Sequence, residues 1–257
     1  MVARKSKAFT LIELLVVVAI IILLVSILTP ALGRVLEHSR RSACAANVRE
    51  IARAVRTYTL TSNLHRGAKA KSFPDIGPDT NNWPAANRAC LWLLVRHGYI
   101  SPETFICPSL DGFTAAKSTA SDFANDNCGY SFITMVEQAR TLNNTDNALV
   151  IVADLNPRFN PGSSTVYDYA DLDHSGGVDS AEQKLADELD ADGKLKNSAT
   201  HGHDGQNVAR LEGSAEFLRK GYVATGSNNH DWIYESTEPQ NDNDGKSRGG
   251  EDVLLLN

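Results

Sequence analysis

The sequence predicts an α+β protein in which a long N-terminal helix packs against a mostly antiparallel β-sheet head. An apolar run at residues 14–28, LLVVVAIIILLVSIL, is extended upstream by residues 9–12. The extended run of about 20 residues is long enough to cross roughly 30 Å of hydrocarbon as a helix. Beyond it, apolar residues recur at steps of three or four, and short β-type segments separated by turn residues follow.

Length and composition limit the class of protein. The chain has 257 residues, and 25 Lys and Arg against 31 Asp and Glu give a formal net charge of −6. A mildly acidic chain is not expected to bind nucleic acid, because phosphate backbones attract positive surfaces. Hydrophobic residues make up 42% of the chain, so a folded core is expected, and the mean hydropathy of −0.26 excludes a protein with many membrane spans.

The apolar run favours a membrane-spanning helix over two other interpretations. A buried helix of a soluble domain is rarely apolar on every face. A secretory leader would have a shorter apolar region and a small-residue cleavage site after it, whereas this segment continues into Pro30-Ala31-Leu32-Gly33-Arg34. Basic residues stand on both sides of the run, at 4, 5 and 7 and at 34, 40 and 41, so charge does not orient it.

The helical pattern continues past the membrane segment. Apolar residues on one face are Leu32, Val35, Leu36, Cys44, Val48, Ile51, Val55 and Tyr58. This spacing predicts one helix over residues 9–61, spanning the membrane at 9–29 and amphipathic afterwards. Residues 61–67 end it, with Gly67 as the break.

The remaining chain, residues 62–257, is predicted to form the head. Turn residues dominate 67–84, and a second helix is expected at 85–97. Short strands are expected at 105–106, 130–133 and 148–153, a hairpin from 206–218 and 222–224, and a final strand at 253–256. Helix and strands in this order indicate an α+β head.

Residues 7–15, KAFTLIELL, resemble the processing site of type IV pilins and of the pseudopilins of type II secretion. The resemblance implies that a prepilin peptidase removes residues 1–8 by cleaving between Ala8 and Phe9, and that Phe9 is then N-methylated. It also implies a single-pass protein of the inner (cytoplasmic) membrane with an extracytoplasmic head, present in the membrane or in a cell-surface pilus. Ala8 departs from the family pattern, which usually has Gly before the cut.

Two residues of the segment are expected to act in assembly. Glu13 is an ionisable residue within the apolar run, which costs on the order of a few kcal/mol and requires a partner. The resemblance implies that the partner is the free amine of Phe9 on a neighbouring subunit. Pro30 lacks an amide hydrogen, so it is expected to bend or locally open the helix near the membrane exit; a plain helix stop is the alternative.

A second resemblance covers nearly the whole chain. Residues 40–51, 105–109, 205–208 and 251–254 are similar to bacterial prepilin-like proteins with an H-x9-DG signature. The signature is imperfect, because ten residues separate His201 from Glu212-Gly213 and Glu replaces Asp. This resemblance supports the pilin-like fold and location and implies no activity.

Four cysteines, Cys44, Cys90, Cys107 and Cys128, are expected to face an oxidising space, where disulfides form. Cys107 and Cys128 stand in loop-like sequence and are the preferred pair. Cys44 and Cys90 lie on apolar helix faces and are either buried thiols or a second bridge.

The most specific local motif is a calcium loop at residues 171–182, within an insertion at 168–199. The sequence DLDHSGGVDSAE fits the EF-hand pattern, with Gly176 at the turn. Its expected ligands are Asp171, Asp173, Ser175, the carbonyl of Gly177, Asp179 and the bidentate Glu182. The Ca²⁺ would order a loop with little apolar surface of its own. An acidic solvated turn is the alternative, and it is the preferred interpretation for the partial matches at 188–199 and 240–251.

No catalytic residue is predicted. His201-Gly-His203-Asp204 is a weak metal pattern without a hydrolytic motif beside it, and Cys107 has no legible thiolate-stabilising setting. Phosphate-binding and dinucleotide-binding fingerprints are absent from the sequence. The chain is therefore interpreted as a pilus or pseudopilus subunit, with the prepilin peptidase, other pilin-type subunits and the membrane as partners. The alternative is a membrane-anchored, calcium-dependent protein that binds a polysaccharide or an exported protein without polymerising.

Overall fold

The structure is a computed structural model that divides into two compact units, residues 1–39 and residues 40–257. Each unit is described by itself. The residues it describes are 10–64, 73–74, 83–110, 112–117, 120, 123, 127–133, 147–155, 197–220, 222–225, 228–232 and 255–256.

Helix α1 (Leu11–Thr61) contains the predicted membrane segment. Its stretch Leu11–Thr29 has a mean hydropathy of 3.3 and is, among the described residues, the one stretch long and apolar enough to span a membrane. The large apolar side chains from Leu11 to Leu28 are each 46–79% exposed. The prediction of one helix over 9–61 is thus confirmed for the residues from Leu11 on.

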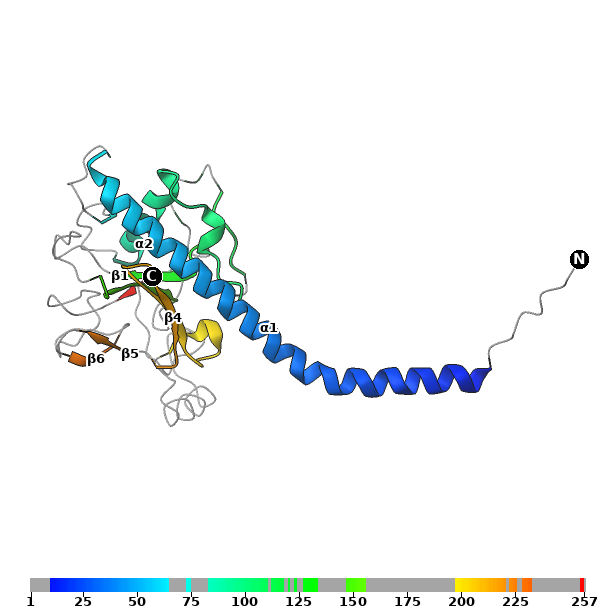
Figure 1. Cartoon of the computed structure of the whole chain (residues 1–257). Helices are drawn as coiled ribbons and strands as arrows, with labels where there is room; N and C mark the ends of the chain where they lie inside the picture. The colour runs from blue at the N-terminus through cyan, green and yellow to red at the C-terminus, as the bar shows by residue number, and fades with distance from the viewer. Residues whose placement is uncertain are drawn as a thin grey trace, which may run out of the picture. The chain divides into compact units, whose positions relative to one another are not determined.

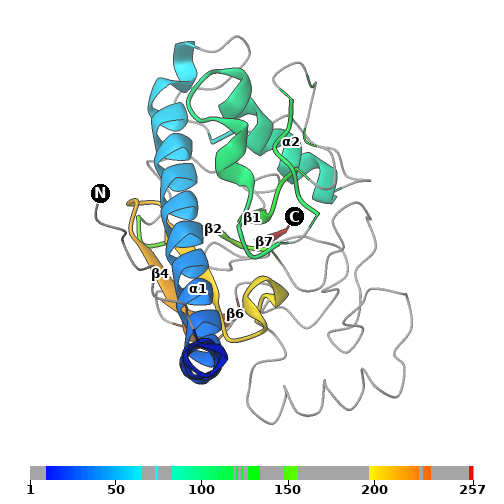
Figure 2. The same cartoon turned by 90° about the vertical axis from the view of Figure 1, so that its right-hand side faces the viewer.

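The second half of α1, from Arg40 onward, packs on the head (Figure 1). Its fully or nearly fully buried side chains include Cys44, Val48, Ile51, Val55 and Tyr58. They recur at alternating steps of four and three, which places them on one stripe of the helix. A single hydrophobic core joins this stripe to side chains of the sheet and of helix α2 (Trp83–Arg96). Figure 2 shows α2 beside the C-terminal half of α1.

The head contains a five-stranded antiparallel sheet with the order β4-β3-β2-β1-β7. Its strands are β1 (Tyr130–Ile133), β2 (Val150–Asp154), β3 (Gln206–Arg210), β4 (Ala215–Leu218) and β7 (Leu255–Leu256). Strand β2 is buried along its whole length because it lies in the middle of the sheet. Its last residue, Asp154, pairs with Tyr130 of β1. The predicted α+β class is confirmed.

Two details of the predicted head were wrong. Phe105 ends a 3₁₀ helix, η2 (Pro102–Phe105), instead of starting a strand, because Pro102 favours a helical first turn. The hairpin forms between β3 and β4, and β5 (Tyr222–Thr225) pairs with β6 (Asn228–Trp232) in a separate two-stranded sheet.

Candidate functional site

The start of α1 is closed by a capping box, the first of two sites. Glu13 Oε2 accepts hydrogen bonds from the Thr10 backbone N at 2.8 Å and from the Thr10 hydroxyl at 2.7 Å. In return, Thr10 Oγ1 accepts a 3.3 Å bond from the Glu13 backbone N. Thr10 and Glu13 occupy the cap and third positions of the helix, where this exchange satisfies otherwise unpaired amides. Glu13 thus has a partner within its own chain, in addition to the partner on a neighbouring subunit that the resemblance implies.

The sequence also predicted roles for Ala8, Phe9 and Pro30. Ala8 and Phe9, at the expected cleavage site, lie outside the described residues. Helix α1 continues through Pro30, so a plain helix stop is wrong. Before it, the hydroxyls of Ser26 and Thr29 donate to the carbonyls of Leu23 and Val25 at 2.8 Å. These bonds satisfy both hydroxyls inside the helix, as a membrane segment requires.

The second site lies in the head, where a disulfide joins α1 to the segment after η2. Cys44 and Cys107 are bridged, with their Cα atoms 5.4 Å apart. The predicted pairing of Cys107 with Cys128 is therefore wrong. Asn47, one helical turn after Cys44, donates to the carbonyl of Ile106 at 3.0 Å, so the helix presents Cys44 directly to Cys107. Cys128 is buried, and its thiol donates to the Tyr130 carbonyl at 3.4 Å.

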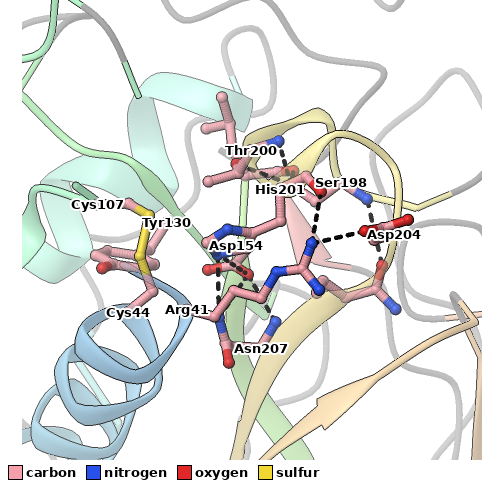
Figure 3. A network of polar contacts seen from close by, with 12 residues as sticks. Arg41, Cys44, Cys107, Tyr130, Asp154, Ser198, Thr200, His201, Asp204 and Asn207 are labelled. Atoms are coloured by element: carbon pink, nitrogen blue, oxygen red, sulfur yellow. Dashed lines mark hydrogen bonds and ion pairs between the residues drawn. A yellow bond between two sulfur atoms is a disulfide. The ribbon is translucent and has the colours of Figure 1, made fainter. Parts of the chain in front are cut away.

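A buried polar cluster, formed by Asp154, His201 and Asn207, lies beside this disulfide (Figure 3). Asp154 Oδ2 accepts two bonds from Asn207, at 2.6 Å from the backbone N and 3.0 Å from Nδ2. It also lies 3.3 Å from His201 Nε2, and neither side chain is exposed to solvent. The end of β2, the start of β3 and the 3₁₀ helix η3 (Ala199–His201) bring these three side chains together.

Arg41 connects α1 to the turn after η3. Its Nη2 forms a 2.7 Å ion pair with Asp204 Oδ2 and lies 3.4 Å from the His201 carbonyl. Its guanidinium also lies over the ring of Phe217, 4.9 Å from the centroid. The turn can reach this position because of Gly205, since a Cβ there would lie 2.2 Å from the Leu218 carbonyl oxygen.

Tyr130 completes the contact between α1 and the sheet. Asn47 Nδ2 donates to its hydroxyl at 3.0 Å. Burial raises the pKa of Tyr130 well above its usual range, and the negative charge of Asp154 raises it further, while the bond from Asn47 acts in the opposite direction. Tyr130 is therefore neutral at ordinary pH.

The structure separates the residues of the weak metal pattern at 201–204. His201 turns inward to Asp154, Asp204 pairs with Arg41, and His203 Nδ1 lies 3.0 Å from the Asn197 carbonyl. Asp154 and Asn207 were not predicted as partners of His201. The available signal was Asp154 itself, a carboxylate that closes the most apolar strand of the chain.

The predicted calcium ligands Asp171, Asp173, Ser175, Gly177, Asp179 and Glu182 lie outside the described residues, as do the partial loops at 240–251 and nearly all of 188–199. The calcium loop therefore stays a prediction.

Comparison with known proteins concerns the first of the two sites. Curated proteins and solved structures gave no match to this chain. Residues 3–29 match the Prokaryotic N-terminal methylation motif, a span that includes the capping box and the apolar part of α1. The resemblance inferred from residues 7–15 is confirmed: the chain carries a prepilin-type N-terminal segment and is, in this respect, similar to type IV pilins and pseudopilins.

Proposed function

We propose that this protein is a structural subunit of a type IV pilus or a type II secretion pseudopilus. A prepilin peptidase cleaves it between Ala8 and Phe9, and the mature chain assembles through α1. One observation carries the proposal: the methylation motif at residues 3–29 coincides with the apolar helical stretch Leu11–Thr29. A motif for processing and a helix for anchoring are thus combined in one segment.

The exposed apolar surface of α1 supports an assembly role. Side chains from Leu11 to Leu28 find no cover within the described part of the chain, and lipid covers them while the subunit is in a membrane. Once the helix leaves the bilayer, water would contact this surface at an unfavourable free energy. Packing against the same helix of neighbouring subunits removes the surface from water again.

The exposed surface also continues beyond the membrane stretch. Leu32, Val35 and Leu36 are 51–64% exposed, although a purely anchoring helix would need apolar residues only within the bilayer. This continuation favours helix-to-helix contact along a longer stretch than the membrane spans. It is a reason to prefer a polymerising subunit over a binding protein that only uses α1 as an anchor.

The contacts of the head with α1 suit a mechanical role. The Cys44–Cys107 bridge, the Asn47 bonds and the Arg41 ion pair all attach the second half of α1 to the head. A displacement of this half of the helix is therefore transmitted to the sheet. We further propose that Ca²⁺ bound at residues 171–182 orders that loop of the head.

Two measurements test the proposal. The full chain is expressed with and without a prepilin peptidase, and intact mass is expected to show loss of residues 1–8 and one added methyl group only with the peptidase. Ala8→Gly, which restores the usual residue, is the matched variant and is expected to be processed at least as well. Mature protein that still begins at Met1 would refute the proposal.

The second measurement separates a subunit from a membrane-anchored binding protein. Filaments are sheared from cells of a host that assembles them, and the sheared and membrane fractions are compared by mass spectrometry. The processed chain is expected in the sheared fraction. A processed chain found in the membrane fraction alone would favour the non-polymerising alternative.

A further inference from the structure

A disulfide, a carboxylate and an imidazole meet at one buried place in the head. The two Sγ atoms of Cys44 and Cys107, an oxygen of Asp154 and a ring nitrogen of His201 all lie within 4.8 Å of one another (Figure 3). None of the four residues is more than 3% exposed. Four potential metal ligands from separate segments of the chain thus converge where solvent does not reach.

We propose that reduction of the Cys44–Cys107 bridge converts this place into a Zn²⁺ site. Thiolate, imidazole and carboxylate are the usual ligands of zinc, which binds four of them in a tetrahedron. Metal–ligand distances of about 2.0–2.3 Å put the ligand atoms of such a site about 3.3–3.8 Å apart. The cluster reaches this geometry by a contraction of about 1 Å, once reduction has released the two sulfurs from each other.

The disulfide and the metal exclude each other, because bridged sulfurs are not thiolates. A dithiol reductant supplies the two electrons. Its own sulfurs form a disulfide, the Cys44–Cys107 bond breaks, and the two protons of the dithiol pass to the cysteine sulfurs. Binding of Zn²⁺ then releases both protons to solvent.

Neighbouring groups already support the proposed ligands. Asn207 donates two hydrogen bonds to Asp154 Oδ2, which fixes the carboxylate, and such outer partners orient the ligands of metal sites. Two thiolates and one carboxylate carry three negative charges, so the site with Zn²⁺ bound would have a net charge of −1. Arg41 brings a positive charge close to this negative charge, because its Nη2 lies 3.4 Å from the His201 carbonyl.

Both states join α1 to the segment after η2. The disulfide joins α1 to the segment after η2, and the metal would join both of them to β2 and η3 as well. In a reducing environment, where disulfides do not persist, Zn²⁺ would therefore replace the covalent link. In an oxidising one, the bridge forms and the site takes no metal.

The test uses the full chain in detergent. One sample stays oxidised, and the other is treated with dithiothreitol and desalted without oxygen. Both are titrated with Zn²⁺ against a coloured chelator, and Co²⁺ reports tetrahedral thiolate coordination by its absorption spectrum. The reduced chain is expected to bind one metal ion more than the oxidised chain. Equal binding by the two samples, or a bridge that survives the dithiol, would overturn the proposal.

Variants assign the ligands. Loss of a residue that hydrogen-bonds to a metal ligand lowers metal affinity roughly 10–100-fold. His201→Gln and Asp154→Asn each remove a ligand itself, so each is expected to lower the Zn²⁺ affinity of the reduced chain by at least this factor. Cys90→Ala removes a buried cysteine outside the site and is expected to leave affinity unchanged. Loss of binding in Cys90→Ala as large as in His201→Gln would contradict the assignment.

A further readout needs no variant. Alkylation of each cysteine in the reduced wild-type chain is followed by peptide mass spectrometry. The factor by which Zn²⁺ slows alkylation is expected to be at least tenfold larger for Cys44 and Cys107 than for Cys90. Uniform protection of the three cysteines would indicate general tightening of the fold and would count against the site.

Discussion

Arg41 of helix α1 and Asp204 of the turn after η3 form a 2.7 Å ion pair across 163 residues of sequence. The Arg41 side chain is 26% exposed and that of Asp204 is 49% exposed. Because water screens such a pair, its ionic part stabilises the fold by about 0–1 kcal/mol. The contact of the guanidinium with Phe217 adds about 0.5–1 kcal/mol.

Replacement of Arg41 by Ala is therefore expected to lower the free energy of unfolding by about 1 kcal/mol. Arg41→Lys keeps the charge without the planar group, so its free energy of unfolding is expected to lie between those of the wild type and Arg41→Ala. Urea unfolding of the full chain in detergent, followed by the fluorescence of buried Trp92, measures both. Arg49→Ala, an exposed position of the same helix, is the control and should change the value by less than about 0.5 kcal/mol.

Removal of the disulfide is expected to have a larger effect. The bridge closes a loop with a sequence separation of 63, so the double change Cys44→Ala and Cys107→Ala should lower the free energy of unfolding by about 2–4 kcal/mol. With a metal chelator present, a dithiol should destabilise the wild-type chain by a similar amount and leave the double variant unchanged. If the dithiol destabilised both equally, the bridge would not be the source of the effect.

Tyr130 predicts a change of stability at alkaline pH. Its pKa is raised in the folded chain, so the folded state opposes loss of its proton. The stability that this neutral group supports is complete below the unfolded pKa of about 10 and is lost as the pH rises above it. Tyr130→Phe should lower the free energy of unfolding by about 1 kcal/mol near neutral pH, because the variant lacks the hydroxyl that accepts from Asn47. This difference in stability from the wild type should shrink at alkaline pH.

Unfolding curves of both chains between about pH 8 and pH 11 measure this difference. Subtracting one curve from the other removes the contribution of the other tyrosines. A difference that stays constant over the whole range would show that Tyr130 does not titrate as its surroundings require.

Glu13 variants separate its charge from its role in the capping box. Glu13→Gln keeps an oxygen that accepts from Thr10 but loses the charge that would pair with the amine of Phe9. The variant is expected to be processed and membrane-bound, and to fall at least about tenfold in sheared filaments, the effect of losing about 1.4 kcal/mol per contact. Thr10→Val removes the capping hydroxyl and retains the charge, so it should still assemble. Normal incorporation of Glu13→Gln would refute the charge pairing.

Calcium binding is tested on the full chain by calorimetry. We expect one site, lost in Asp171→Ala and in Glu182→Ala, because each removes a ligand of the predicted loop. Asp190→Ala, in the degenerate loop at 188–199, serves as the matched control and should bind normally. Retention of binding in Glu182→Ala would favour a solvated acidic turn instead.

Features that depend on neighbouring residues in the sequence, such as helices, strands and their buried faces, were predicted from local patterns. The length of the apolar run predicted the helical stretch that is long and apolar enough to span a membrane. The step of three and four placed Cys44, Val48 and Ile51 on the buried face of α1. The apolar strand ending at Asp154 was also predicted, with its start two residues later than expected.

Contacts between distant segments were not predictable in the same way. The partner of Cys107 depends on how α1 lies on the head, and no spacing of the four cysteines contains that information. The meeting of Asp154, His201 and Asn207 likewise depends on strand order, which brings β2 and β3 together across an insertion. The 3₁₀ helix ending at Phe105 was missed because Phe105 and the following Ile106, taken alone, resemble a short strand.

Under the proposed function, the bonds between Thr10 and Glu13 concern a subunit that has not yet joined a filament. In such a subunit the Glu13 carboxylate accepts hydrogen bonds from Thr10 of the same chain. These bonds would lower the free-energy cost of the carboxylate in lipid before another subunit binds. In the proposed assembly, joining a filament would exchange the bonds between Glu13 and Thr10 for a bond to another chain. Retention of single subunits in the membrane would therefore depend on Thr10 and Glu13, whereas their entry into a filament would depend on the charge of Glu13.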